Sequence, residues 1–375
     1  MTKCMISITS WSVEGIQVQS GIHTEEEAQK KMVSIKDVAQ VAGVSTATVS
    51  RVLADSPRVR AVVRDRVMAV VKELDYSPNR VARNLRSRKS NVIGLIVSDI
   101  ENPFFHQVSR AVEDAAHEQG YSVMLCNNDE DSDKEKRYLR LLRDENVAGV
   151  ILSPTRPTAD NFAETSMLNI PMVVIDRRVN NVAVDNILID NVQSAHTIVS
   201  HLIQHGHHRI GAIFGAGSTT GRERHEGYVK ALKDHHIQVL SELVAFTNPR
   251  EEDGFSTTLK LLKLAEPPDA ILTSNSLLAA GALGALRENN VSIPDEIALA
   301  SFDETTWTRL VVPTLTVIEQ PTHEIGRTAT ELLIKRIQDP KRSNREVILK
   351  AKLIVRQSCG CQNNNGIRER KKPGC

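Results

Sequence analysis

The sequence predicts a small all-α head built on a helix-turn-helix, followed by an α/β body of two lobes with doubly wound parallel sheets. Three observations point to this organisation. Short helical patterns with a glycine-marked turn fill residues 34–74, apolar strand patterns alternate with helical ones from residue 91, and charge is spread unevenly between the two regions. A chain of 375 residues is long enough for two or three domains with buried cores.

Residues 34–53, SIKDVAQVAGVSTATVSRVL, predict two short helices joined by a tight turn. Ser34 and Asp37 have the spacing of a capping box, which marks the start of the first helix. Gly43 can adopt the left-handed conformation that ends this helix, and the Ser45 hydroxyl can cap the next one. An ordinary helical hairpin with a solvated face would show the same pattern, so these residues alone leave that alternative open.

The second helix has an outer face suited to a DNA major groove. Val49, Val52 and Leu53 should turn inward, which leaves a face that is small except for one arginine: Thr46, Ala47, Ser50 and Arg51. We expect these four residues to contact base edges. The residues expected to contact the DNA backbone are Ser45, Lys36, Arg60 and Arg80.

A third helical pattern should complete a three-helix core. Its apolar stripe consists of Val59, Val62, Val63, Val67, Val70, Val71 and Leu74. Its outer face is strongly basic and carries Arg58, Arg60, Arg64, Arg66 and Lys72. We expect the stripe to face the first two helices and the basic residues to remain in solvent.

The run from Ser34 to Arg86 resembles the DNA-binding head and hinge of the LacI/GalR family of bacterial repressors, which includes ribose and purine repressors. The resemblance rests on SIKDVAxxAGVSxxTVSRVL, the YSPN turn and the ARNL hinge, which occur in order and at the family's spacing. Similarity continues to about Gln357, so only the two ends are uncovered. The resemblance implies a homodimer that represses transcription from a palindromic operator in double-stranded DNA.

The hinge, from Pro78 to Arg86, is too short to form a stable helix by itself, since isolated helices below about 12 residues are marginal in water. We expect it to fold only on DNA. The resemblance implies that paired hinge helices place Arg83, Asn84 and Leu85 in the minor groove, where Leu85 wedges between base steps and kinks the duplex.

Residues 91–358 alternate near-continuous apolar strands with helices, which is typical of parallel sheets buried on both faces. The pattern occurs twice, so we expect two lobes. We place lobe 1 at about 91–191 and 321–348, and lobe 2 at about 192–320 and 349–358.

The last segment of this body should connect the two lobes. A helix from about His323 to Gln338 and a strand from Glu346 to Val355 are together too long for the edge of either lobe. In family terms this segment crosses back between the lobes, which gives the architecture of periplasmic sugar-binding proteins.

Ligands of open α/β sheets bind beyond the carboxyl ends of strands, so a two-lobed body should bind them in the cleft between its lobes. The candidates for a small-molecule effector are Asn102, Phe104, Phe105, Asp176, Arg222, Arg224, Asn275 and Asp303. Their carboxylates, amides, guanidinium groups and aromatic faces suit a polyhydroxylated ligand. The ENPFF turn at 101–105, which is similar to an SNPFF turn, and the polar cleft favour a pentose or similar sugar over a purine. Taken singly, each could equally well cap a helix. The resemblance implies that some of these residues occupy the positions where family members hold their effector. They are Phe104 or Phe105, Asp176, Arg224, Asn275 and Asp303.

The glycine-rich segment 211–221, GAIFGAGSTTG, departs from a dinucleotide-binding loop. Its third glycine falls at position 221 instead of 220, and no carboxylate ends a strand about twenty residues later. We interpret it as a strand-to-helix turn beside the cleft. Because the sequence also lacks a nucleophile elbow, a Walker loop and a CxxC pair, we expect no enzymatic activity and no cofactor.

Two groups of possible metal ligands occur, and we expect neither to bind a metal. His201 and His205 lie one helical turn apart, beside His207 and His208, but positive charge at a helix C-terminus explains this cluster better. The basic tail, residues 359–375, could combine its three thiols, but they lack the paired spacing of a zinc site: Cys359, Cys361 and Cys375.

The net charge of +1 is the sum of a basic head and an acidic body. Residues 32–90 carry twelve Lys and Arg against five Asp and Glu (+7), residues 1–31 contribute −1 and residues 359–375 contribute +3, which leaves −8 for residues 91–358. The head therefore suits an anionic polymer. A cytoplasmic sensor that binds nucleic acid without sequence preference is the alternative, and its affinity would fall with salt equally on every DNA.

The remaining features place the chain in the cytoplasm. Its five scattered cysteines are too few for a disulfide framework, and no apolar run approaches the roughly 20 residues of a membrane span. We expect a cytoplasmic, nucleoid-associated protein that contacts no membrane. Its parts are a disordered leader at 1–31, a DNA-binding head at 32–77, a hinge and linker at 78–90, then the body and tail.

Overall fold

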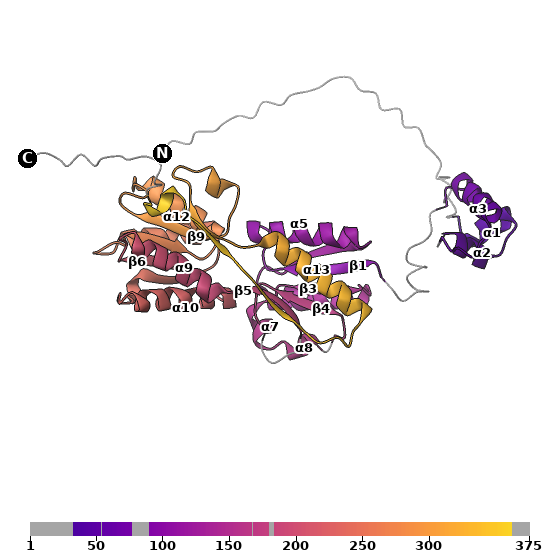
Figure 1. The fold of residues 1–375 in the computed structure, drawn as a ribbon, viewed down its shortest axis with the longest axis horizontal. Helices are drawn as coiled ribbons and strands as arrows, with labels where there is room; N and C mark the ends of the chain where they lie inside the picture. Colours follow the sequence, from indigo (N-terminus) through magenta and orange to yellow (C-terminus); the bar gives the residue numbers. More distant parts are fainter. Residues whose placement is uncertain (1–32, 54, 77–89, 167, 180–183, 362–375) are drawn as a thin grey trace, which may run out of the picture. The chain divides into compact units, whose positions relative to one another are not determined.

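The computed structural model confirms the predicted fold class, a helical head and a two-lobed α/β body (Figure 1). It describes residues 33–53, 55–76, 90–166, 168–179 and 184–361, which fall into two compact units that we describe separately. Several predicted features lie outside the described residues: the leader at 1–31, the hinge with Arg80, Arg83, Asn84 and Leu85, and Cys375. Among the described residues, no helix has both the length and the apolar character needed to span a bilayer.

The head consists of α1 (Ile35–Ala42), α2 (Thr46–Leu53) and α3 (Ala61–Glu73). The predicted capping box is confirmed, because the Ser34 N–H donates to Asp37 Oδ2 at 2.8 Å and the Asp37 N–H donates to Ser34 Oγ at 3.4 Å. Gly43 ends α1 in the left-handed conformation (φ 63°), and the Thr48 N–H donates to Ser45 Oγ at the start of α2. The core of the head is formed by Val38, Ala39, Ala42, Val49, Val52, Val67 and Val70.

Two predictions for the third helix are wrong. Val62 is 76% exposed, because it lies five positions before the buried Val67, which places the two about 140° apart around the helix. Arg64 does not point freely into solvent, since its guanidinium contacts Asp55 Oδ1 at 2.7 Å and the Ser56 carbonyl at 2.8 Å. It fixes the loop between α2 and α3.

Lobe 1 is a six-stranded parallel sheet with the order β11-β5-β4-β3-β1-β2. Its strands are β1 (Val92–Val97), β2 (Ser122–Asn127), β3 (Gly149–Leu152), β4 (Met172–Ile175), β5 (Asp185–Ile189) and β11 (Glu346–Leu349). Its helices are α5 (Pro103–Glu118), α6 (Ser132–Asp144), α7 (Arg156–Asp160), α8 (Ala163–Ser166) and α13 (Thr322–Gln338). Helices α5 and α13 cover one face of the sheet, and α6 and α7 cover the other.

Lobe 2 repeats this plan with the order β12-β10-β9-β8-β6-β7, in which only the β10–β12 pair is antiparallel. Its strands are β6 (Ile210–Gly215), β7 (Val244–Thr247), β8 (Ala270–Thr273), β9 (Ala298–Phe302), β10 (Thr316–Glu319) and β12 (Lys352–Ile354). Its helices are α9 (Asn191–Gln204), α10 (Thr219–Asp234), α11 (Glu251–Leu262) and α12 (Ser276–Glu288). One core lies under α9 and α10, and the other lies under α11 and α12.

The strand predicted from Glu346 to Val355 is two strands. β11 joins the sheet of lobe 1 and β12 joins the sheet of lobe 2, since one short strand cannot pair within both sheets. Between them, Ala351 packs against the cores of both lobes. The segment that connects β11 to β12 therefore packs into both lobes and holds them side by side.

Candidate functional site

The outer face of α2 is the candidate DNA-reading surface of the head. Ala47, Ser50 and Arg51 are exposed and Thr46 is half-buried, while Val49 and Val52 fill the core behind them. Three residues predicted to contact the DNA backbone are also exposed: Lys36, Ser45 and Arg60. The surface is therefore accessible, and its contacts with DNA remain a prediction.

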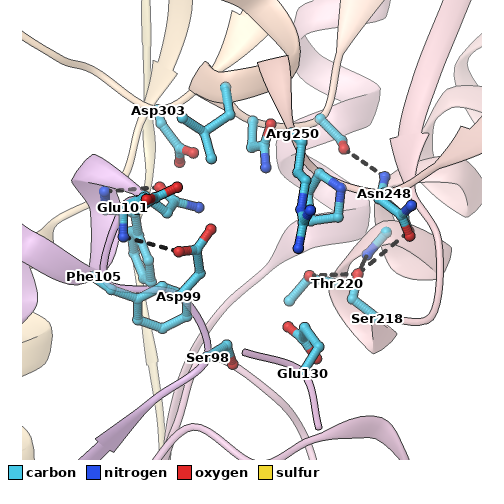
Figure 2. A pocket seen from close by; sticks show the side chains of 18 of the residues that line it. Ser98, Asp99, Glu101, Phe105, Glu130, Ser218, Thr220, Asn248, Arg250 and Asp303 are labelled. Carbon is cyan, nitrogen blue, oxygen red and sulfur yellow. Dashed lines mark hydrogen bonds between the residues drawn. The ribbon is translucent and has the colours of Figure 1, made fainter. Parts of the chain in front are cut away.

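The candidate ligand site is a cleft of about 820 Å³ between the two lobes of the body. Its walls are built at the carboxyl ends of strands, because parallel strands bring these ends to the same edge of each sheet. Figure 2 shows the carboxylates of Asp99, Glu130 and Asp303 and the guanidinium of Arg250 around one shared space. The glycine-rich turn after β6 also lines the cleft, as the sequence predicts.

Asp176 follows β4 in lobe 1, and its backbone adopts the left-handed conformation (φ 69°), which aspartate tolerates better than most residues. Burial raises the pKa of this carboxyl to about 6, although the charges of Arg177 and Arg224 oppose the shift. Arg177 Nε lies 3.5 Å from the carboxylate. The same guanidinium donates to Glu130 Oε2 at 2.7 Å and to the Pro154 carbonyl at 2.8 Å, so Arg177 is already paired within lobe 1.

Arg224 enters the cleft from α10 in lobe 2 and is only 5% exposed. Its Nε donates to Asn191 Oδ1 at 2.8 Å, Nη1 donates to the Ser274 carbonyl, and its guanidinium lies 4.1 Å from the centre of the Phe302 ring. Burial lowers the pKa of Arg224, while the charges of Asp303 and Asp176 oppose that shift. This guanidinium therefore acts across the cleft on a carboxylate of the other lobe.

Asp303 follows β9 in lobe 2, again with a left-handed backbone (φ 75°). Burial raises its pKa, and the opposing influences are the Arg224 charge and two hydrogen bonds. Gln320 Nε2 donates to Oδ1 at 2.6 Å and the Ser276 N–H donates to Oδ2 at 3.4 Å.

Seven of the eight predicted effector residues line the cleft: Asn102, Phe104, Phe105, Asp176, Arg224, Asn275 and Asp303. Arg222 is not among the lining residues. Its side chain is 56% exposed, with Nη2 at 4.0 Å from Asp160, because two residues along a helix from Arg224 is a rotation of about 200°.

Asn102 and Asn275 line the cleft and also cap the helices that follow them, which is the structural role that the sequence leaves open for each. Asn102 Oδ1 accepts the Phe104 N–H at 3.0 Å, and Asn275 Oδ1 accepts the Leu278 N–H at 2.9 Å. Phe104 and Phe105 form an edge-to-face pair with ring centres 4.9 Å apart, and each is at most 5% exposed. These caps and packed rings make the wall rigid.

Sequence reasoning missed much of the lining. The residues it did not select include Ser98, Asn127, Asp129, Glu130, Ser218, Thr220, Asn248, Arg250, Glu251, Glu252, Ser274 and Gln320. Asp99, Glu101 and Arg177 belong to strand-end segments that the sequence does indicate as cleft candidates, and they line the cleft. Asn127, Asn248 and Gln320 end or directly follow strands, so the rule that located Asp176 could have found them. Glu130 is placed by its ion pair with Arg177, which no local pattern indicates.

The lining of the cleft is acidic, with eight carboxyl groups and three guanidinium groups among the residues named for it. The guanidinium groups act across the gap as well as within each lobe. Arg250 of lobe 2, for example, opposes the rise that burial causes in the pKa of Asp99 in lobe 1. Such a cleft offers many hydrogen-bond acceptors and disfavours a strongly anionic ligand.

Comparisons with known proteins cover both units of the chain. Residues 34–79 match the model of bacterial regulatory proteins, lacI family, and residues 90–357 match that of periplasmic binding proteins and sugar binding domain of LacI family. A ribose operon repressor of Halalkalibacterium halodurans is 37% identical over 328 residues, which are 87% of this chain and 97% of that protein. The HTH-type transcriptional repressor PurR of Mannheimia succiniciproducens is 32% identical and covers 87% of this chain and 98% of its own length.

A solved structure of the lac repressor dimer bound to operator and the anti-inducer ONPF is also similar. It has a TM-score of 0.79 and 28% identity, and the match covers 88% of this chain and 99% of that one.

Proposed function

The chain belongs to the LacI family of bacterial regulatory proteins, as its resemblance indicates, and we propose that it represses transcription as a homodimer on a palindromic operator, controlled by a neutral sugar in the cleft. The observation that carries this proposal is the combination of an exposed, groove-sized face on α2 with a separate polar cleft in one chain. The test is selection of bound DNA from a random pool, with and without added sugars. An inverted repeat should emerge, whereas a sensor with non-specific nucleic-acid binding would enrich none.

Arg51 is the residue we expect to contribute most to base recognition. It is exposed on the same α2 surface as the small side chains Ala47 and Ser50, and a guanidinium can donate two hydrogen bonds to one guanine. The Arg51→Ala variant should lose about 1–3 kcal/mol of discrimination at one base pair in each half-site. Binding measured on every single-base variant of the selected operator would reveal this. Equal loss of affinity on all sequences would instead make Arg51 a phosphate contact.

A neutral sugar suits the cleft better than a purine or a phosphorylated sugar. Eight carboxyl groups can accept hydrogen bonds from hydroxyls, while an added phosphate would meet a net negative lining. Phe104 and Phe105 form an edge-to-face pair that lines the cleft. An aromatic ring in this position can cover the apolar face of a sugar. The ribose operon repressor among the relatives supports a pentose.

Thermal shift assays distinguish these ligands. We expect ribose or a related pentose to raise the melting temperature of the full chain, and hypoxanthine, ribose 5-phosphate and NAD to leave it unchanged. A ligand at 100 times its Kd would add about 2.7 kcal/mol of stability, which is readily measured. A shift with the purine alone would contradict the sugar assignment and leave the DNA-binding proposal intact.

Control of DNA affinity would follow from closure of the lobes around the ligand. A ligand that contacts Asp176 in lobe 1 and Arg224 in lobe 2 binds the closed body more tightly than the open one, so it shifts the population toward closure. The selected operator should therefore change its affinity for the chain when the sugar is added. An unchanged affinity at saturating sugar would remove the coupling from the proposal.

A further inference from the structure

Three metal-ligating side chains meet in lobe 2, away from the cleft. His201 lies in the last turn of α9, Cys359 ends a 3₁₀ turn at Gln357–Cys359, and Cys361 follows two residues later. His201 Nε2 lies 3.3 Å from Cys359 Sγ and 3.1 Å from Cys361 Sγ, and the two sulfur atoms are 2.9 Å apart. The three donor atoms therefore converge on one point, and none of these residues lines the cleft.

The surroundings hold these side chains in place. Cys359 is fully buried in the core under α9 and α10, and Cys361 packs against the same core. Between them, Gly360 adopts the left-handed conformation (φ 77°), which glycine provides without a steric cost and which lets Cys361 return to the same side.

The histidines that the sequence places at this helix end have roles around the cluster. His207 Nε2 contacts the Cys359 carbonyl at 3.1 Å, and His205 Nδ1 contacts the His201 carbonyl at 2.7 Å, with the His201 and His205 rings 4.4 Å apart. Both contacts are to main-chain carbonyls of ligand residues, so they hold the backbone from which the His201 and Cys359 side chains project. The helix-cap interpretation explains His205 but does not explain why His201 faces two sulfur atoms.

Two cysteine sulfurs and one imidazole nitrogen are a donor set for soft ions such as Zn²⁺ and Cu⁺. We propose that His201, Cys359 and Cys361 bind one thiophilic metal ion and thereby tie the end of the body to α9. With Zn–S bonds of about 2.3 Å in tetrahedral geometry, the two sulfurs would lie about 3.8 Å apart, so they need to separate by less than about 1 Å. Cys361 and His201 are only half-buried, which leaves a side from which an ion can enter and where a fourth ligand can bind.

The sequence alone does not indicate this set. It suggests Cys375 as the third ligand beside the two tail thiols, or His205 as the partner of His201, and each of these groupings is incomplete. The fold brings together residues 158 and 160 positions apart.

The test is a Zn²⁺ titration of the reduced full chain against a chromogenic chelator, with Co²⁺ as a spectroscopic probe of thiolate ligation. One equivalent should bind, and Co²⁺ should give the charge-transfer absorption of a cobalt–thiolate bond. His201→Gln and Cys361→Ser should each weaken Zn²⁺ binding by about 100-fold or more, because loss of a partner outside the ligand shell already costs 10–100-fold. Both positions are half-buried, so these variants should fold even if Cys359→Ser does not.

Matched controls separate this site from other thiols and imidazoles. Cys126→Ser removes a buried cysteine of lobe 1, and His208→Gln removes an exposed histidine near the cluster, and both should bind Zn²⁺ as the unchanged protein does. Undiminished Zn²⁺ binding by His201→Gln and Cys361→Ser would overturn the proposal. So would a Cys359–Cys361 disulfide that persists in a reducing glutathione buffer, since it would consume both sulfur ligands.

Discussion

The two lobes of the body share a backbone plan but handle buried charge differently. Asp176 follows β4 in lobe 1 and Asp303 follows β9 in lobe 2, both with left-handed backbones and pKa values raised by burial. Each backbone N–H donates to the adjacent strand, at 3.1 Å to the Ile187 carbonyl and 2.9 Å to the Ile318 carbonyl. The repeated fold therefore places two carboxyl groups symmetrically on either side of one cleft.

The difference lies in the arginines. Arg177 is bound by Glu130 within its own lobe, and its pKa is raised because the charge and hydrogen bonds of Glu130 outweigh the lowering effect of burial. Within the part of the chain that the structure describes, the hydrogen-bond partners of Arg224 are neutral, and burial lowers its pKa. The arginine of lobe 1 is thus already paired within its lobe, whereas Arg224 of lobe 2 is available to a ligand or to the opposite lobe.

The largest effect should come from Arg177→Met. Removing one partner of a buried ion pair costs about 3–5 kcal/mol, and because Glu130 is 35% exposed we expect the lower end, about 3 kcal/mol. Arg224→Met should cost less stability, because its hydrogen-bond partners are neutral and Asp303 keeps the hydrogen bonds of Gln320 and Ser276 when the Arg224 charge is lost. Urea unfolding of the two variants measures this difference, and equal losses would mean that both lobes depend on their arginines in the same way.

The same pair separates stability from ligand response. Arg224→Met should keep its fold and lose the thermal shift with ribose, because this guanidinium faces the cleft and the carboxyl groups of both lobes. Conversely, an Arg224→Met protein that still responds to ribose would show that the ligand is held by lobe 1 and the carboxyl groups alone.

The next effect concerns Asp176 and pH. Its pKa is about 6 in the folded chain and about 3.8 as a free side chain, so the folded state binds its proton more tightly. Stability attributable to this group is therefore present below about pH 4 and is lost as pH rises through about 6, at a cost of up to about 3 kcal/mol. Asp176→Asn should be more stable than the unchanged chain at pH 7.5 and no more stable at pH 4. A stability difference that does not vary with pH would contradict the raised pKa.

The sequence predicts the order of elements well where apolar periodicity is strong. The capping box at Ser34 and the left-handed Gly43 were identifiable because they depend on neighbours within three residues. The sequence does not indicate the strands β5, β7 and β10, because polar residues interrupt their apolar pattern. β5 begins with the buried polar pair Asp185 and Asn186, and β7 and β10 end in polar residues. Asp185 is tolerated there because Arg336 and Arg342, from a distant segment, pair with it.

The same limit applies to the cleft, where only residues that follow predicted strands can be selected from the sequence. Residues that follow nearly continuous apolar strands, such as Asp176 and Asp303, are indicated by position alone. Glu130 and Arg250 belong to the cleft through the fold, and no spacing in the sequence connects them to their partners across 47 or more residues. Arg222 was selected because its charge resembles that of Arg224, but helical geometry turns it away.

The smallest effect should come from Gln320→Leu, which tests how lobe 2 supports its carboxylate. Gln320 Nε2 donates to Asp303 Oδ1 at 2.6 Å. It lies beside Asp303 in lobe 2, as Arg177 lies beside Asp176 in lobe 1, but its amide carries no charge. A hydrogen bond to a charged group is worth about 1.5–3 kcal/mol, and we expect about 1.5 kcal/mol here because the Ser276 N–H and the Arg224 charge remain.

The pH dependence of Gln320→Leu fixes the interpretation. Because the lost hydrogen bond favours ionised Asp303, the penalty should be full where that carboxyl is charged and should shrink as pH falls and it takes up a proton. Gln320→Glu is the contrasting variant, since it places a second carboxylate against Asp303 and should be worse than leucine at high pH. Urea unfolding across a pH series gives both curves. If the stability lost in Gln320→Leu instead grew as pH falls, Gln320 would be stabilising the protonated form of Asp303. Lobe 2 would then favour protonated Asp303, in contrast to lobe 1, where the Arg177 charge favours ionised Asp176.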